Sequence, residues 1–171
     1  MANVQTAIDY VIGTWEDVGL TGVITTNKRT GKRTRFGIDE TWHPECSNTG
    51  FFTTMSKEDA LAVAERIYTY AYAGPLATKF ITSQSVANKV LSLGINVGNA
   101  NAAKLLQLAV NTPFDPDGKI GDITLYLTNS QDPAITLANL TTRAVEYYEN
   151  VVKNKPEDQE FLEGWLRRAR A

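Results

Sequence analysis

A carboxylate at the end of a predicted helix is the first group in this sequence that could do chemistry. Apolar side chains recur at helical spacing over residues 4–15, and Glu16 follows them directly. Residues 21–36 are predicted to form a β-hairpin, because β-branched residues flank a polar connection that contains Gly31. Such a hairpin can fold back as one wall of a cleft with Glu16 at its root. A partly desolvated carboxyl group holds its proton to higher pH, which suits an acid catalyst.

The predicted hairpin carries a cluster of basic residues and no acidic one. These residues are Lys28, Arg29, Lys32, Arg33 and Arg35. One interpretation is a solvated ribbon, whose long charged side chains keep an exposed edge from aggregating. The other is attraction to a polyanion such as a cell-wall polymer. We favour the first interpretation.

Length and composition predict one globular domain without membrane insertion. The chain has 171 residues and a formal net charge of -2, so the total charge does not indicate binding to nucleic acid or to an anionic membrane. The single cysteine, Cys46, excludes an internal disulfide and fits a reducing compartment. The N-terminus lacks the pattern of a signal peptide, and no apolar run approaches the ~20 residues that span a bilayer.

The rest of the chain predicts further helices. Ser56 begins one as an N-cap, and Gly74-Pro75 ends it. Apolar spacing predicts others over residues 83–93, 100–109, 120–127 and 136–152, and a final one with a basic tail near residues 161–170. A short helix is expected to begin within residues 37–42. The fold class is therefore mainly α with one small β-hairpin.

Two loops resemble parts of metal sites, but neither has a full ligand set. His43 and Cys46 lie close in sequence, yet the chain has no second histidine or cysteine. Residues 115–118 look like half of a calcium loop, but Thr124 stands where the bidentate glutamate is needed. We expect no metal and no cofactor.

Several motifs occur in an order that resembles a known family. They are Glu16 after an amphipathic helix, Thr34-Arg35-Phe36-Gly37-Ile38, Ile67-Tyr68 with Tyr70, Asn96-Val97-Gly98, Asp117-Gly118-Lys119-Ile120-Gly121, Tyr147-Tyr148, and Phe161-Leu162-Glu163-Gly164-Trp165-Leu166-Arg167-Arg168-Ala169. The set is similar to the bacterial and phage N-acetylmuramidases of glycoside hydrolase family 108. The similarity extends over nearly the whole chain, and its Gly-Trp-Leu-x-Arg-Ala ending is quite specific.

This resemblance implies a peptidoglycan hydrolase that cleaves the β-1,4 bond between N-acetylmuramic acid and N-acetylglucosamine. It implies a lysozyme-like single domain, with a catalytic segment over residues 1–92 and a helical peptidoglycan-binding-like segment over residues 93–171. By the same resemblance, Glu16 is the general acid and Thr34 helps to place the attacking water. The expected partner is the glycan strand, with no nucleic acid, and the expected state is a monomer. Without a signal peptide, the expected setting is a phage endolysin or a virion-associated lysin made in the bacterial cytoplasm.

The sequence departs from the family around the second catalytic group. Asp17-Val18-Gly19 follows Glu16 in place of Gly-Gly-Tyr, and no acidic residue lies between Gly19 and Arg35. Glycoside hydrolysis needs a group on the other face of the sugar as well as the acid. The candidates are Asp17, Asp39 and Glu40, although Asp39 and Glu40 are also suited to a first helical turn. Alternatively, Thr34 with Asn27 orients water without a carboxylate base.

Two further residues are candidates for binding sugar. Tyr68, Tyr70 and Tyr72 alternate along a predicted helix and cannot share one face, so we expect Tyr68 in the core and Tyr70 free to stack on sugar. Asn96 is suited either to an N-acetyl group or to capping the next turn. Tyr147, Tyr148 and Trp165 are expected in the core between the last two helices.

Two other functions stay open. The missing acidic loop after Glu16 suits a non-catalytic peptidoglycan-binding or virion structural protein on a lysozyme scaffold. A weaker alternative is an enzyme that acts on a related glycan such as chitin.

Overall fold

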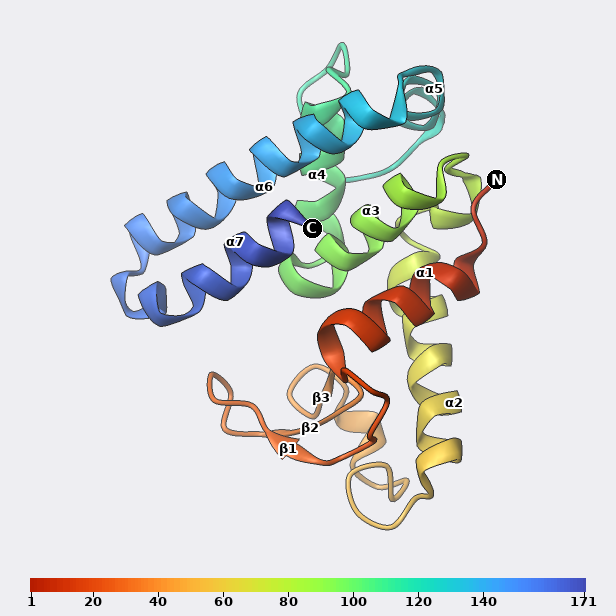
Figure 1. The fold of residues 1–171 in the computed structure, drawn as a ribbon, viewed down its shortest axis with the longest axis vertical. Helices are drawn as coiled ribbons and strands as arrows, with labels where there is room; N and C mark the ends of the chain where they lie inside the picture. Colours follow the sequence, from red (N-terminus) through yellow and green to blue (C-terminus); the bar gives the residue numbers. More distant parts are fainter.

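The structure is a computed structural model that describes residues 1–171. Helices make up most of it, and a small sheet lies at one end (Figure 1). The α-helices are α1 (Val4–Val11), α2 (Lys57–Ile67), α3 (Gln84–Val97), α4 (Asn99–Ala109), α5 (Asp122–Ser130), α6 (Pro133–Asn154) and α7 (Leu162–Arg170). The shorter helical segments are the π-helices η1 (Ile12–Glu16) and η3 (Tyr68–Ala73) and the 3-10 segments η2 (Pro44–Cys46), η4 (Thr78–Phe80) and η5 (Pro156–Phe161).

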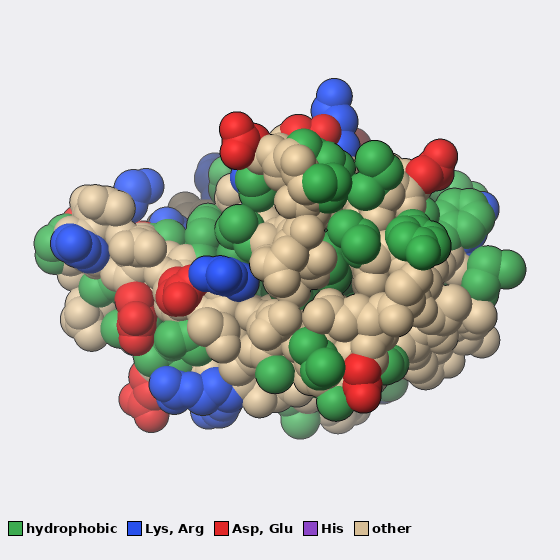
Figure 2. Space-filling view, turned by 90° about the horizontal axis from the view of Figure 1, so that it is seen from above, with side chains coloured by type: hydrophobic (Ala, Val, Ile, Leu, Met, Phe, Trp, Pro, Cys, Tyr) green, Lys and Arg blue, Asp and Glu red, His purple; other side chains and the backbone are tan.

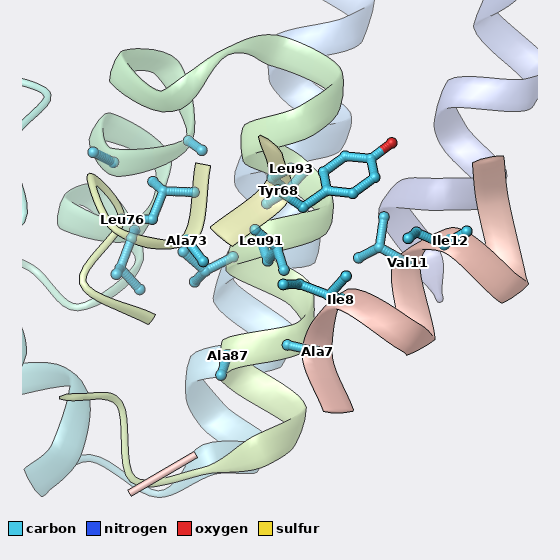
Figure 3. Close-up of a cluster of buried hydrophobic side chains, with 14 of the residues drawn as sticks. Ala7, Ile8, Val11, Ile12, Tyr68, Ala73, Leu76, Ala87, Leu91 and Leu93 are labelled. Atoms are coloured by element: carbon cyan, nitrogen blue, oxygen red, sulfur yellow. The ribbon is translucent and has the colours of Figure 1, made fainter. Parts of the chain in front are cut away.

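One hydrophobic cluster joins the N-terminal and C-terminal parts of the chain. It contains 30 buried residues that run from Ala7 on α1 to Ala169 on α7. In Figure 3, Ile8 and Val11 of α1 point toward Leu91 of α3, while Tyr68 turns its hydroxyl group away from the apolar side chains. The helical spacing of the apolar residues therefore produces the burial that it predicts.

The sheet confirms the predicted hairpin and adds a third strand. β1 (Thr25–Thr26) pairs antiparallel with β2 (Arg33–Arg35), and Thr25 lies opposite Thr34. β2 pairs in turn with β3 (Ile38–Asp39), and Thr34 lies opposite Asp39. The predicted short helix within residues 37–42 is wrong, because Phe36 and Gly37 both take a positive φ and turn the chain back onto β2.

The basic residues of the hairpin are not all solvated, and our favoured interpretation fails for Arg35, which is buried. Arg35 is 6% exposed and donates hydrogen bonds to the carbonyl oxygens of Gly22, Phe51 and Met55. Arg33 pairs with Glu40, and Arg29 pairs with Asp158. Only Lys28 and Lys32 are exposed without an ion pair. These arginines tie the sheet to the loops and helices around it.

One face of the molecule carries no patch of a single charge sign. On the face seen in Figure 2, acidic, basic and apolar side chains are interspersed. None of the helices combines the length and the hydropathy needed to cross a membrane.

Candidate active site

A cleft of about 740 Å³ separates the sheet from the helical part of the molecule. In Figure 1 the β1–β2 ribbon extends below α7, on the side where this cleft opens. One side of the cleft, which we call the hairpin wall, is formed by Asn27, Arg29, Thr30, Asp39, Trp42 and His43. The other side, which we call the helical wall, is formed by Ile95, Asn96, Val97, Gly98, Phe161, Trp165 and Arg168. Glu16, Gly37 and Tyr72 complete the lining where the walls meet.

Glu16 lies at the base of the cleft, as expected from its place before the hairpin. It is the last residue of η1, and the π-helical turn there follows directly on α1. A π-helical turn is rare, and it changes the direction in which the following side chains point. The aliphatic part of Glu16 packs against Gly37, where an added Cβ would lie 2.6 Å from Glu16 Cβ and 2.4 Å from the Tyr68 hydroxyl oxygen. Gly37 therefore allows the third strand to approach the carboxylate.

The carboxyl group of Glu16 forms an ion pair with an arginine from the other end of the chain. Arg168 Nη2 lies 2.7 Å from Glu16 Oε1, and the two side chains are 10% and 15% exposed. The contact lacks the alignment of a hydrogen bond, so Oε1 has none. Arg168 is itself fixed, because Nε donates to Ser92 Oγ and Nη2 donates to the Ser92 carbonyl oxygen. Its guanidinium also lies over the Trp15 ring.

Asp39 is the second carboxylate that lines the cleft. It is 6% exposed, and its Oδ2 accepts hydrogen bonds from Asn27 Nδ2, Thr30 Oγ1 and Thr34 Oγ1 at 2.7, 2.8 and 3.3 Å. Its Oδ1 accepts a hydrogen bond from the Thr41 backbone N–H. Burial acts to raise the pKa of Asp39, but the hydrogen bonds from Thr41, Thr30 and Asn27 outweigh it and hold this pKa below its ordinary value.

A hydrogen-bonded chain of side chains lies beside Glu16. His43 Nδ1 is 3.0 Å from Glu45 Oε1, and His43 Nε2 is 3.2 Å from the Tyr72 hydroxyl oxygen. The pKa of Tyr72 is raised by burial and by the negative charges of Glu16 and Glu45. Tyr72 therefore presents a neutral hydroxyl group at the cleft.

Aromatic rings hold the helical wall together. Trp165 stacks on Tyr148 with centroids 5.4 Å apart and on Phe161 with centroids 5.9 Å apart. The Arg29 guanidinium lies over Trp165, 5.8 Å from the ring centroid, while it pairs with the buried Asp158. The hairpin tip is thus attached to the C-terminal helices. Tyr148 is buried as expected, whereas Trp165 also faces the cleft.

The residues predicted from the sequence are distributed unevenly around the cleft. Asn27 and Asn96 line it, but Asn27 already donates to Asp39. Thr34 does not line the cleft, and its hydroxyl group contacts Asp39. Tyr70 is 79% exposed and does not line the cleft either.

The other two predicted carboxylates also do not line the cleft. Glu40 is held by Arg33 and Ser47, and these contacts lower its pKa to about 2. Asp17 accepts hydrogen bonds from Thr21 and Gly22 and shapes the loop after η1. Of the three candidates for the second group, only Asp39 lines the same cleft as Glu16.

Several cleft residues were missed by the sequence reasoning. Arg168, His43 and Trp42 carry no local signal that places them in the same cleft as Glu16. For Tyr72 a signal existed, because it follows Tyr68 by one helical turn, and the two rings lie 5.8 Å apart on the same side. No group of three or more His, Cys, Asp or Glu side chains is arranged to hold a metal ion.

Comparisons with known proteins give two likenesses. Residues 101–170 match a family model described as a predicted peptidoglycan domain. Among solved structures, the chain is similar to the structure of Brucella abortus SagA, with a TM-score of 0.72 and 22% sequence identity over 97% of this chain and 88% of that chain. No curated protein matches.

These likenesses confirm the fold class and associate the chain with peptidoglycan. The fold is mainly α and lysozyme-like, with a small antiparallel sheet. The segment that matches the predicted peptidoglycan domain includes α6 and α7, and it supplies Trp165 and Arg168 to the cleft. The association with peptidoglycan therefore applies to one wall of the site that holds Glu16.

Proposed function

We propose that this protein cleaves the glycan strand of peptidoglycan at the β-1,4 bond between N-acetylmuramic acid and N-acetylglucosamine, as a muramidase of the glycoside hydrolase family 108 type. The observation that carries the proposal is that Glu16 and Asp39 line one cleft, to which the segment matching a predicted peptidoglycan domain contributes Phe161, Trp165 and Arg168. Two carboxyl groups at one sugar-sized cleft are what glycoside hydrolysis requires.

The two carboxyl groups would have different roles because their surroundings differ. Glu16, flanked by the neutral hydroxyl group of Tyr72, donates a proton to the leaving glycosidic oxygen. Asp39, with its lowered pKa, stays ionised and stabilises positive charge as it develops on the sugar. Thr30 and Thr34 fix the orientation of Asp39 through their hydroxyl groups. In this proposal Thr34 acts on Asp39, and Thr30 is the hydroxyl group that lines the cleft.

The ion pair of Glu16 with Arg168 favours a second candidate function, a non-catalytic peptidoglycan-binding protein. An ion pair is made by the carboxylate, whereas a general acid acts in its protonated form. In the catalytic proposal, Arg168 orients Glu16 until substrate fills the cleft. In the binding proposal, the pair is permanent and the cleft only holds glycan.

The deciding experiment compares wild type with Glu16→Gln on purified Gram-negative peptidoglycan, by turbidity and by new reducing ends. Glutamine keeps the size of the side chain but cannot donate the proton, so we expect a loss of about 10²- to 10⁴-fold in rate. Asp39→Asn should also lower the rate. Glu40→Gln, which changes a carboxylate that does not line the cleft, is the matched control and should retain activity.

Each other outcome has a definite meaning. Equal activity of wild type and Glu16→Gln would remove Glu16 from the mechanism. No activity in any variant, with retained binding to peptidoglycan, would support the binding protein. Release of reducing ends from chitin rather than from peptidoglycan would show that the substrate is chitin.

A further inference from the structure

A second hollow continues the cleft along the C-terminal half of α6. Its volume is about 470 Å³, and it is lined by residues that include Arg29, Tyr147, Tyr148, Asn150, Asn154 and Lys155. Arg29, Asn96 and Trp165 line both this hollow and the cleft. A ligand that lies in the cleft can therefore extend into this hollow past Arg29 and Trp165 without leaving the protein surface.

The charged groups of this hollow are both basic. Arg29 and Lys155 line it, and no Asp or Glu does. Arg29 uses Nη2 for its pair with Asp158, while Lys155 takes part in no ion pair. Two cations without a lining acid attract a ligand that carries carboxylates.

The other lining groups suit amides and small apolar groups. Asn150 and Asn154 are one turn apart on the same face of α6. Asn150 has no side-chain hydrogen bond within the protein, and Asn154 Nδ2 donates only to the Asn150 carbonyl oxygen. Trp165 and Val151 add apolar surface. This combination of amide, cation and apolar groups is typical of a site for a short acidic peptide.

A buried hydroxyl group gives an independent indication of a ligand. Tyr148 lines the hollow and is 2% exposed, yet its hydroxyl group has no hydrogen-bond partner. Buried polar groups without a partner are rare in folded proteins because each one costs free energy. A carbonyl or carboxylate oxygen of a ligand that reaches the Tyr148 hydroxyl group would supply the missing acceptor.

We infer that this hollow binds the stem peptide of peptidoglycan while the glycan strand occupies the cleft. The inference rests on the proposed function. The lactyl group of each N-acetylmuramic acid carries a short peptide with carboxylates, amide groups and small aliphatic side chains. The carboxylates match Arg29 and Lys155, and the amide groups match Asn150 and Asn154. The small aliphatic side chains match the face of Trp165. A continuing neutral stretch of sugar would leave Lys155 without an anionic partner.

The test compares two substrates and three variants. Intact peptidoglycan carries stem peptides, and glycan strands stripped of them by an amidase do not. We expect Lys155→Gln to lower kcat/KM about three- to tenfold on intact peptidoglycan and Tyr148→Phe to lower it about threefold, with no loss on stripped strands. Lys153→Gln is the matched control, because Lys153 is exposed on the same helix and does not line the hollow.

Two results would overturn the inference. Equal loss on both substrates would mean that the hollow holds glycan, and loss on neither would mean that it takes no part in binding. If wild type cleaves neither substrate, the proposed function fails separately, and the inference is then judged by binding of a soluble N-acetylmuramyl tripeptide, measured by calorimetry. Binding that is weakened by Lys155→Gln but not by Lys153→Gln supports the stem-peptide site, and equal binding by all three proteins rejects it.

Discussion

The two walls of the cleft are held in place by different forces. In the hairpin wall, the Thr30 hydroxyl group and the Asn27 amide donate to one charged atom, Asp39 Oδ2, which also accepts a hydrogen bond from Thr34 outside the wall. In the helical wall, Trp165 is fixed by ring contacts with Tyr148 and Phe161. The first arrangement depends on the charge of one residue and so on pH, whereas the second depends on shape and apolar burial. Short strands with little apolar surface can thus form one side of a cleft when a buried carboxylate organises them.

The largest expected effect comes from Gly37→Ala, which breaks the junction between the walls. The new methyl group would overlap Glu16 and the Tyr68 hydroxyl oxygen, and Gly37 has φ +76°. We expect a loss of about 4 kcal/mol in the free energy of unfolding, from backbone strain and overpacking together. Gly31→Ala is the control, because Gly31 has φ +68° but open space around it. This variant should lower the free energy of unfolding by about 1 kcal/mol. Urea unfolding measures the change for both variants. Equal losses in the free energy of unfolding would contradict the close approach of Gly37 to Glu16 and Tyr68.

The next largest effect is expected for Trp165→Ala, which removes the centre of the helical wall. Loss of the stacked ring should lower the free energy of unfolding by about 3 kcal/mol. The loss should be the same from pH 3 to pH 7, because no charge is removed. Trp42→Ala is the matched control, since Trp42 lines the same cleft but is 72% exposed, and it should change stability little. A cost that varied steeply with pH would show that the helical wall also depends on a titrating group.

Asp39→Asn should have a smaller effect that depends on pH. At pH 7 the variant lacks the charged hydrogen-bond acceptor, so we expect its free energy of unfolding to fall by about 2 kcal/mol. Because the pKa of Asp39 is lowered in the folded protein, its ionised form stabilises the fold above the ordinary aspartate pKa of about 3.9. That contribution disappears as the pH falls through the lowered pKa, so the difference from wild type should shrink in acid. Asp115→Asn, at an exposed position, serves as control in thermal unfolding from pH 2 to pH 7.

Glu40→Gln should have the smallest effect, because Glu40 forms a partly exposed pair with Arg33 that does not line the cleft. The pKa of Glu40 is lowered to about 2, so its contribution is present above the ordinary glutamate pKa and is lost as the pH falls toward 2. We expect a slightly lower Tm at pH 7 that converges with wild type near pH 2. A loss as large as that of Asp39→Asn would contradict the contrast between the two neighbouring carboxylates.

Local sequence signals predicted the scaffold well. Apolar periodicity located α3, α4, α5 and α6 within a few residues, and Ser56 caps α2 as expected. The hairpin over residues 21–36 forms because its turn chemistry agrees with the β-branched residues around it. The placement of Glu16 at a helix end before the hairpin also followed from the sequence.

Contacts between residues far apart in sequence could not be predicted in this way. Arg168 reaches Glu16 across almost the whole chain, and only the packing of α7 beside α3 brings them together. Tyr72 lies on the same side of its helix as Tyr68, as helical spacing predicts, but its contact with His43, 29 residues away in the sequence, depends on tertiary packing. Asp39 faces the cleft because β3 replaces the short helix expected there.

The sequence by itself determined the mainly helical class, the hairpin and the carboxylate at its root, since each depends on interactions within a few residues. Only the tertiary structure decided which second carboxylate faces Glu16, which cation pairs with it and which hollow extends the cleft. Those features depend on how α6, α7 and the sheet pack against one shared core, and burial of apolar surface there is not directional enough to be deduced from the order of residues.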